Sequence, residues 1–206
     1  MLLKKFRDII DSQYRMPSGL LGWYIGEKMN RQHKTETNWT INLLNLQENE
    51  DILDIGCGAG YAIKLLLDES PTHRVTGIDL SKTLINSAKR RNYKKITNKR
   101  ASFVLGNVNN LPFKDRQFSR VFSIHSIYFW GDLQGSINEI HRVLKPTSSL
   151  CITLCDGKNG VSWEGITKMI HSQLLPLLEE AGFKNVRIIR GPLSRKYHTL
   201  AVTGEL

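Results

Sequence analysis

A short apolar run that ends in three closely spaced glycines constrains the fold of this chain more than any other feature. Residues 52–55 read Ile-Leu-Asp-Ile, as in a buried strand, and Gly56, Gly58 and Gly60 follow at once. A helical pattern of apolar residues begins at Tyr61. Because glycine carries no side chain, a strand, a glycine turn and a helix in this order let the backbone approach a bound ligand closely.

An acidic residue further along the chain indicates what kind of ligand the turn binds. Asp79 ends a second apolar run, residues 74–79, roughly 20 residues beyond the glycine turn. At that distance, in nucleotide-binding βαβ units, a carboxylate meets a ribose hydroxyl. Together the two features predict a nucleoside-containing cofactor. They disfavour the alternative, an ordinary tight turn in an α/β protein that binds no nucleotide.

The spacing of the glycines indicates which cofactor this is. A dinucleotide fingerprint reads G-x-G-x-x-G, and its third glycine allows the helix to pack closely on the strand. Here the spacing is G-x-G-x-G, and Tyr61 stands where that third glycine would be. Asp54, just before the turn, would place a negative charge near a pyrophosphate, whereas it suits a ligand with an ammonium group. A dinucleotide is therefore disfavoured.

Two stretches of sequence resemble a known family. Asp-Ile-Gly-Cys-Gly-Ala-Gly (54–60) and Val-Thr-Gly-Ile-Asp (75–79) are similar to motifs one and two of the class I S-adenosylmethionine-dependent methyltransferases, in the small-molecule branch of ubiquinone and menaquinone biosynthesis. The resemblance implies an α/β fold with a Rossmann-like, doubly wound sheet of seven strands, mostly parallel with an antiparallel last strand, and an N-terminal helical cap. It also implies S-adenosylmethionine as cofactor, S-adenosylhomocysteine as product, and no metal.

Apolar runs alternate with helical patterns along the chain, as is typical of such a sheet. We predict a single methyltransferase domain over residues 1–206, in which 1–48 form the cap and 49–206 the core. The glycine-containing segment 16–26 is expected to pack and also to move. The expected strands are 51–55, 74–79, 102–106, 118–125, 149–154, 186–189 and 197–203. The expected helices are 1–14, 27–46, 59–69, 82–92, 132–144 and 165–180, the last of them kinked at Pro176 unless it restarts there.

By the resemblance, the cofactor contacts fall at the carboxyl ends of the strands. Asp79 is expected to accept hydrogen bonds from both ribose hydroxyls, and Leu80 and Leu84 to contact adenine. Asn107 stands where the family's G-D-A-x-x-L-P-F motif has an acid that meets the adenine amino group, and its amide carbonyl can accept the same N–H. The expected cofactor-binding residues are Asp54, Gly56, Cys57, Gly58, Gly60, Asp79, Leu80, Leu84, Asn107, Val108 and His125.

The resemblance also places His125 beside the methionine part of the cofactor. Its imidazole is the first candidate for a general base, because the ordinary pKa of histidine allows proton removal near neutral pH. The alternative is that His125 contacts the cofactor only through its backbone or by packing. Tyr128 and Trp130, in the aromatic loop that follows, are expected either to line the acceptor pocket or to pack in the core.

Charge and composition bear on the partners of this chain. The net charge is +10, and seven cations gather at positions 89, 90, 91, 94, 95, 99 and 100. They fit a nucleic-acid or anionic-lipid patch, or more simply a solvated helix end, and only Tyr93 among them offers a stacking surface. No apolar run approaches the roughly 20 residues that span a bilayer. The three cysteines cannot form a closed disulfide set and are expected to be buried thiols.

Together these features predict methyl transfer from S-adenosylmethionine to O, N or C of a small-molecule acceptor by direct displacement, in a cytoplasmic monomer or homodimer. Two alternatives stay open. The same fold can methylate RNA or protein, although no Asn/Asp-Pro-Pro-Tyr/Phe tetrapeptide follows the fourth strand, where Ser123-Ile-His-Ser stands. The chain can also be a non-catalytic module that only binds the cofactor.

Overall fold

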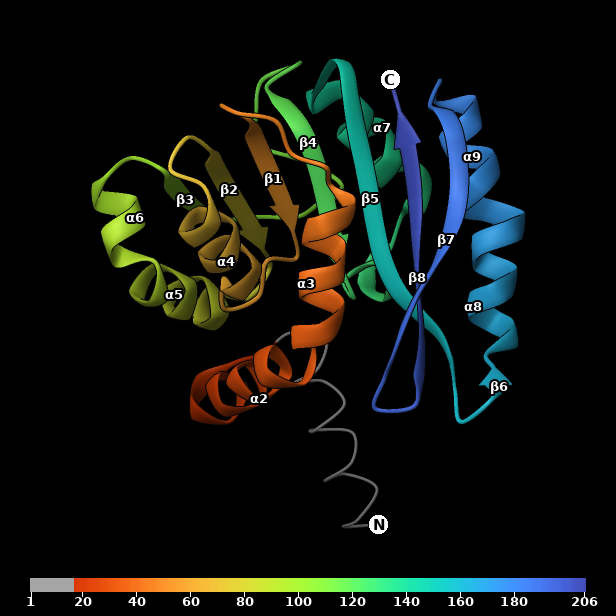
Figure 1. The fold of residues 1–206 in the computed structure, drawn as a ribbon, viewed down its shortest axis with the longest axis horizontal. Helices are drawn as coiled ribbons and strands as arrows, with labels where there is room; N and C mark the ends of the chain where they lie inside the picture. Colours follow the sequence, from red (N-terminus) through yellow and green to blue (C-terminus); the bar gives the residue numbers. More distant parts are fainter. Residues whose placement is uncertain (1–16) are drawn as a thin grey trace.

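A mixed β-sheet forms the centre of the molecule (Figure 1). The computed structural model describes residues 17–206, so the helix expected over residues 1–14 lies outside the described chain. The strand order is β3-β2-β1-β4-β5-β8-β7, with a short β6 paired to β5. The strands are β1 (Asp51–Ile55), β2 (Arg74–Asp79), β3 (Ala101–Leu105), β4 (Phe118–Ile124), β5 (Leu144–Lys158), β6 (Val161–Ser162), β7 (Lys184–Ser194) and β8 (Tyr197–Glu205).

The direction of the strands confirms the doubly wound sheet. Strands β3, β2, β1, β4 and β5 are parallel, whereas β8 runs antiparallel to both of its neighbours, β5 and β7. From β1 the chain moves outward to β2 and β3, and then returns to β4 on the other side of β1. Ligands of such sheets bind at the carboxyl ends of the strands where the order reverses, which is where the glycine turn after β1 lies.

Helices cover both faces of the sheet (Figure 1). Side chains of β1 alternate between two apolar clusters, as the pleat of a strand requires: Leu53 and Ile55 pack in the cluster that includes Ile140, and Ile52 packs in the cluster that includes Leu66. The helices are α2 (Gly19–Gln32), α3 (Lys34–Leu43), α4 (Tyr61–Glu69), α5 (Lys82–Arg91), α6 (Tyr93–Thr97), α7 (Leu133–Val143), α8 (Glu164–Met169) and α9 (Leu175–Glu180). Among the described helices, none has both the length and the apolar character needed to cross a membrane.

The segment before β1 differs from the expectation. The helix expected over 27–46 is instead two helices, α2 and α3, because the backbone leaves the helical conformation at His33 (φ −98°, ψ 19°). Within the expected segment 16–26, residues 19–26 are helical as well, since α2 already begins at Gly19. Figure 1 shows α2 beyond the carboxyl ends of β1 and β2, whereas α3 lies against the middle of the sheet. Of the two, α2 is therefore the helix that covers the glycine turn.

The carboxyl-terminal half also departs from the expected boundaries. Strand β7 continues through the expected loop 191–196 as far as Ser194, so the hairpin turn is reduced to Arg195 and Lys196. Both turn residues have positive φ (49° and 68°), as tight hairpin turns require. The helix expected over 165–180 contains a wider π-helical turn (Ile170–Leu174), and Pro176 lies in the first turn of α9, where its missing N–H costs little. The backbone stays helical from α8 through the π-helical turn into α9, so the helix continues across this proline.

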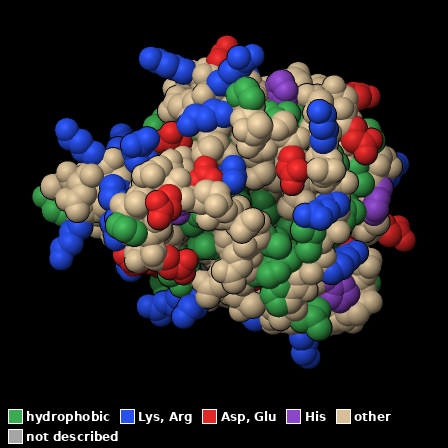
Figure 2. All heavy atoms as spheres, turned by 45° about the horizontal axis from the view of Figure 1, so that its top comes forward, with side chains coloured by type: hydrophobic (Ala, Val, Ile, Leu, Met, Phe, Trp, Pro, Cys, Tyr) green, Lys and Arg blue, Asp and Glu red, His purple; other side chains and the backbone are tan. Residues whose placement is uncertain are grey.

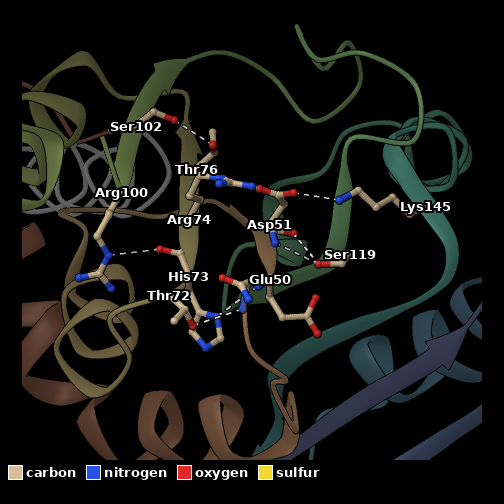
Figure 3. Close-up of polar contacts among 11 residues, drawn as sticks. Glu50, Asp51, Thr72, His73, Arg74, Thr76, Arg100, Ser102, Ser119 and Lys145 are labelled. Carbon is tan, nitrogen blue, oxygen red and sulfur yellow. Dashed lines mark hydrogen bonds and ion pairs between the residues drawn. The ribbon is translucent and has the colours of Figure 1, made fainter. Parts of the chain in front are cut away.

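An ionic network ties the amino ends of the strands together, at the edge opposite the glycine turn (Figure 3). The carboxylate of Asp51 in β1 accepts hydrogen bonds from Arg74 Nε of β2 and from Lys145 Nζ of β5, each at 2.9 Å. The backbone N–H of Asp51 donates to Ser119 Oγ of β4 at 3.1 Å. One residue of the central strand thus contacts three other strands.

Candidate active site

The turn after β1 requires glycine for two physical reasons. Gly56, Gly58 and Gly60 have φ of 73°, 53° and 72°, in the left-handed region that favours glycine. A Cβ on Gly56 would lie 2.3 Å from the Cβ of Ser126, so the turn packs directly against the loop after β4. A Cβ on Gly58 would meet no described atom within 4 Å. The backbone at Gly58 is therefore open to a ligand.

Asp79 holds the glycine turn from the end of β2. Its Oδ2 accepts a hydrogen bond from the Gly58 N–H at 2.9 Å, and its Oδ1 accepts one from the Ser81 N–H at 2.8 Å. Burial raises the pKa of the Asp79 carboxyl, and these two backbone donors oppose the rise. Each carboxylate oxygen keeps a second lone pair, so both can still accept a hydroxyl of a ligand.

A second carboxyl group lies just before the turn. The side chain of Asp54 is 3% exposed and lines the cavity at the turn. Burial raises its pKa well above the ordinary value, and the negative charge of Asp79 raises it further. A cation placed in the cavity would stabilise the ionised form of Asp54. The buried Asp54 and the half-buried Asp79 together therefore suit a positively charged ligand.

Two adjoining cavities lie at the carboxyl ends of the strands and share Gly56, Asp79, Ser126 and Phe129 as walls. The first, which we call the α2 cavity, lies under α2 and alongside the glycine turn. The second, which we call the β3 cavity, lies beyond β2 toward the end of β3. The α2 cavity is also lined by Pro17, Met29, His33, Asp54, Cys57, Gly58, Leu84 and His125. The β3 cavity is also lined by Leu80, Asn107, Val108 and Trp130.

The expected cofactor residues other than Gly60 line one or both of these cavities, and Leu84, expected at adenine, lines the α2 cavity and not the β3 cavity. Gly60 precedes α4 as its N-cap and packs against Ala88. The Oδ1 of Asn107 accepts a hydrogen bond from the Asn109 N–H at 3.1 Å, which closes a short turn. Cys57 is buried, as are Cys151 and Cys155, and none of the three forms a disulfide. The buried thiols are as expected.

The two aromatic residues expected near the acceptor lie in different places. Trp130 lines the β3 cavity, and its Nε1 donates to Ser126 Oγ at 3.1 Å. The hydroxyl of Tyr128 donates to the carbonyl oxygen of Cys155 at 3.0 Å, and its ring stacks on His125 with 6.3 Å between ring centroids. Tyr128 therefore supports His125 from behind, at the junction of β4 and β5.

The surroundings of His125 bear on its expected role as a general base. Burial lowers the pKa of the imidazole well below its ordinary value, and the charges of His33 and Arg195 lower it further, against a smaller opposing effect of Glu36. The side chain is 9% exposed. His125 is therefore neutral at physiological pH and a weak proton acceptor. A lowered pKa makes the imidazole a weaker base than an ordinary histidine, and the general-base role of His125 stays a prediction.

Sequence reasoning missed the groups around His125. Glu36 of α3 is fully buried, and its Oε1 lies 3.5 Å from His33 Nδ1, 3.9 Å from His125 Nε2 and 3.8 Å from Arg195 Nη2. Burial on its own raises the pKa of Glu36, but the neighbouring His33 and other polar groups outweigh it, so the pKa lies below its ordinary value. The spacing His-x-x-Glu, which places His33 and Glu36 three residues apart, was a readable signal.

Comparisons with known proteins identify the family. The methyltransferase domain family matches residues 53–152. The 2-phytyl-1,4-naphtoquinone methyltransferase of Nostoc sp. is 30% identical over 155 residues, which cover 74% of this chain and 68% of that protein. The chain belongs to the class I S-adenosylmethionine-dependent methyltransferases.

Two further similarities support this assignment of the chain to the family. The uncharacterized methyltransferase YdaC of Bacillus subtilis (strain 168) is 28% identical over 163 residues, which cover 79% of this chain and 87% of YdaC. The crystal structure of a SAM dependent methyltransferase from Aquifex aeolicus superposes with a TM-score of 0.72 at 20% identity, covering 89% of this chain and 97% of that one. At this identity the superposition shows a shared fold. The cofactor of the methyltransferase is S-adenosylmethionine.

Proposed function

We propose that this enzyme methylates a small molecule at O, N or C by direct displacement, and that the two adjoining cavities hold the cofactor. The observation that carries the proposal is the α2 cavity, which lies between the glycine turn and the helix α2 that covers it. An acceptor that binds under this helix must be a small molecule or must insert only a narrow part of a larger one. A folded polymer surface does not fit such a space.

The residues present suit S-adenosylmethionine in one orientation. Asp54 lies where it can pair with the ammonium group, and the open backbone at Gly58 leaves room for the carboxylate end. Asp79, shared by both cavities, would accept the ribose hydroxyls. Leu80, Val108 and the carbonyl of Asn107 would then surround adenine in the β3 cavity. In this orientation the reactive end faces His125.

For this reaction the chain mainly has to align the acceptor with the methyl group of the cofactor. When bound, S-adenosylmethionine supplies a methyl group that is activated by its sulfonium. The acceptor's electron pair forms the new bond in line with the breaking C–S bond, and the C–S electrons return to sulfur as a thioether. Holding the two reactants at this angle can provide most of the rate enhancement, because a bimolecular step becomes effectively unimolecular. Walls of the α2 cavity from α2, α3 and the loop after β4 would set that alignment.

The walls of the α2 cavity indicate the class of acceptor. They include the apolar side chains of Pro17, Met29, Leu84, Ile124 and Phe129. Relatives of this chain are named for apolar acceptors or acyl carriers, among them the phytyl-naphthoquinone enzyme of Nostoc and a sterol C-methyltransferase of Arabidopsis thaliana. We expect an acceptor with an apolar body and one nucleophilic atom. We also expect the enzyme to act in the cytoplasm as a monomer or homodimer.

A labelling experiment tests this function. The full chain is incubated with S-adenosylmethionine that carries an isotope in its methyl group, together with a panel of reduced quinones, phenols, amines and fatty-acid derivatives. In parallel it is offered total RNA and total protein. We expect label in at least one apolar small molecule, detected by mass spectrometry. Label that appears only in RNA or in protein would contradict the proposal.

A further inference from the structure

We propose that His33, Glu36 and His125 form a binding site for one divalent transition-metal ion, with its open side facing the α2 cavity. The three side chains come from separate parts of the fold: His33 from the break between α2 and α3, Glu36 from the first turn of α3, and His125 from the end of β4. Each offers one ligand atom, and these atoms all lie within 4.8 Å of one another.

The distances within this cluster fit shared ligation of an ion better than hydrogen bonding. The separations of 3.5 Å and 3.9 Å from Glu36 Oε1 to the two imidazoles exceed the roughly 2.7–3.2 Å of a hydrogen bond. Two ligands bound to the same zinc ion at about 2.0–2.2 Å lie roughly 3.0–3.5 Å apart. The largest separation among the three ligand atoms, up to 4.8 Å, would have to shorten by about an ångström for all three to bind one ion, which side-chain rotations can provide.

Buried polar atoms that lack partners point to the same site. Among the described residues, neither Oε1 nor Oε2 of Glu36 has a hydrogen-bond partner, and neither does His125 Nε2. Glu36 is fully buried, and His125 is 9% exposed as a side chain. A buried carboxylate without hydrogen bonds is costly for a fold, whereas a bound cation would pair with one oxygen of Glu36 and with His125 Nε2 at once.

One cation of the chain competes for the same carboxylate. Arg195, in the β7–β8 turn, lies 3.8 Å from Glu36 Oε1 and 3.5 Å from His33 Nδ1 through its Nη2 atom. Its side chain is 39% exposed, so it can turn outward into solvent when an ion binds. Arg195 thus balances the charge of Glu36 in the metal-free protein. Its removal should strengthen metal binding.

The ligand types indicate the metal. Two imidazoles and one carboxylate are typical of sites for Zn²⁺ or Fe²⁺ that keep a position open for a further ligand, whereas Mg²⁺ and Ca²⁺ prefer oxygen ligands throughout. Both histidines line the α2 cavity, while Glu36 lies behind them. The open position of the ion therefore faces the space in which we place the acceptor.

This position would give the metal a chemical role, which rests on the proposed function. An acceptor hydroxyl bound to the ion loses its proton to solvent more readily, because the ion stabilises the resulting oxyanion. The oxyanion then forms the O–C bond to the methyl carbon as the C–S bond breaks and its electrons pass to sulfur. The neutral His125 acts here as a ligand, so no side-chain base is needed. The acceptor class becomes a hydroxyl compound such as a phenol or a reduced quinone.

Zinc titration of the full chain tests the site without relying on activity. Protein stripped with a chelator is titrated with Zn²⁺ in a calorimeter, and Co²⁺ is added to a second sample so that its visible absorption reports nitrogen and oxygen ligands. We expect one ion per chain. We expect Glu36→Gln and His33→Asn each to weaken zinc binding at least tenfold, and the matched control His171→Asn, at an exposed histidine of the π-helical turn, to leave it unchanged.

The opposing cation gives a second, independent outcome. Arg195→Ala should tighten zinc binding severalfold, whereas Lys196→Ala at the neighbouring turn position should not, because no contact joins that side chain to the cluster within the described chain. Absence of stoichiometric zinc, or equal affinity in wild type and in both ligand variants, would overturn the proposal and leave a purely electrostatic cluster. Titration of the same samples with S-adenosylmethionine separates this failure from a failure of the cofactor site.

Discussion

At the scale of single residues, Asp79 is expected to affect cofactor affinity most. Its carboxylate orients the glycine turn through Gly58 and lies on the wall shared by both cavities. We predict that Asp79→Ala weakens S-adenosylmethionine binding more than tenfold, measured by calorimetry. The control Asp115→Ala, at a side chain that is 75% exposed, should bind normally. Unaltered affinity in Asp79→Ala would count heavily against the proposed cofactor orientation.

Two glycines of the turn should respond differently to the same change. An alanine at Gly56 suffers both the strain of positive φ and a clash with Ser126, which is itself held by a hydrogen bond to the Ile55 carbonyl oxygen at 3.0 Å. We predict that Gly56→Ala lowers the free energy of unfolding by about 2–5 kcal/mol. Gly58→Ala meets only the strain, about 1–2 kcal/mol.

Denaturant unfolding of both variants measures the difference, and the folded Gly58→Ala protein allows a further comparison. Because its new methyl group extends into the space where we place the cofactor, Gly58→Ala should bind S-adenosylmethionine more weakly while staying folded. Equal stability of the two alanine variants would contradict the prediction, because it would show that an alanine at Gly56 does not clash with Ser126.

At the scale of elements, the contacts of Asp51 join β1 to β2 and β5 (Figure 3). Burial on its own raises the pKa of Asp51, but Arg74 and Lys145 outweigh it, so the pKa lies below its ordinary value. A carboxylate with a lowered pKa contributes stability that is present above its unfolded pKa and is lost as the pH falls through the folded value. Its contribution at neutral pH should be modest, since Arg74 is 64% exposed.

We predict that Asp51→Asn lowers the free energy of unfolding by about 0.5–1 kcal/mol at pH 7. The variant should also lose less stability than the wild type between about pH 5 and pH 2, because it has no carboxylate to protonate there. Thermal unfolding across this range measures both effects. Glu164→Gln, at an exposed position, serves as control. A variant that follows the wild-type pH dependence throughout would rule out this role for Asp51.

The parallel half of the sheet was predictable at this scale because its signals are local. Strands β1 and β2 are apolar runs that end at a glycine or an acid, and Ser81, a residue type that favours the N-cap, caps α5 by accepting a hydrogen bond from the Leu84 N–H at 3.2 Å. The break at His33 was not predictable, since residues 27–46 contain no proline. It arises where α2 turns beyond the sheet edge while α3 packs on the sheet (Figure 1).

The candidate site also has one part that the sequence predicted and one part that it did not. The glycine turn and Asp79 were readable because their spacing along the chain reflects a local βαβ geometry. The cluster around Glu36 was not, although His33-x-x-Glu36 gave a partial signal. Arg195 lies far along the chain from Glu36, and only the long β7–β8 hairpin brings its turn to α3. Contacts of this kind depend on tertiary packing that sequence periodicity does not encode.

At the scale of the whole molecule, part of the positive charge is paired within the fold. Three of the seven cations between positions 89 and 100 have internal partners: Arg91 pairs with Glu27, Lys95 with Asp68 at 2.8 Å, and Arg100 donates to the His73 carbonyl oxygen at 3.4 Å. On the face shown in Figure 2, Lys and Arg side chains are interspersed with Asp and Glu. The remaining cations of the group are Lys89, Arg90, Lys94 and Lys99.

We predict that replacing these four exposed cations by glutamine leaves the methylation of a small acceptor within about twofold of the wild type in kcat/KM, which corresponds to about 0.4 kcal/mol. The reason is their position at the end of α5, on α6 and just after it, where none of them lines either cavity. Steady-state kinetics at physiological salt measures this. A tenfold loss that worsens at low salt would instead indicate an anionic macromolecular substrate.

The central claim is that the glycine turn and Asp79 hold S-adenosylmethionine across the two adjoining cavities. A crystal structure of the full chain with S-adenosylhomocysteine tests it most directly. The account predicts the ribose on Asp79, adenine beside Asn107 and Val108, and the sulfur atom in the α2 cavity. A ligand found away from the turn, or a dinucleotide that occupies the turn in preference to it, would contradict the account.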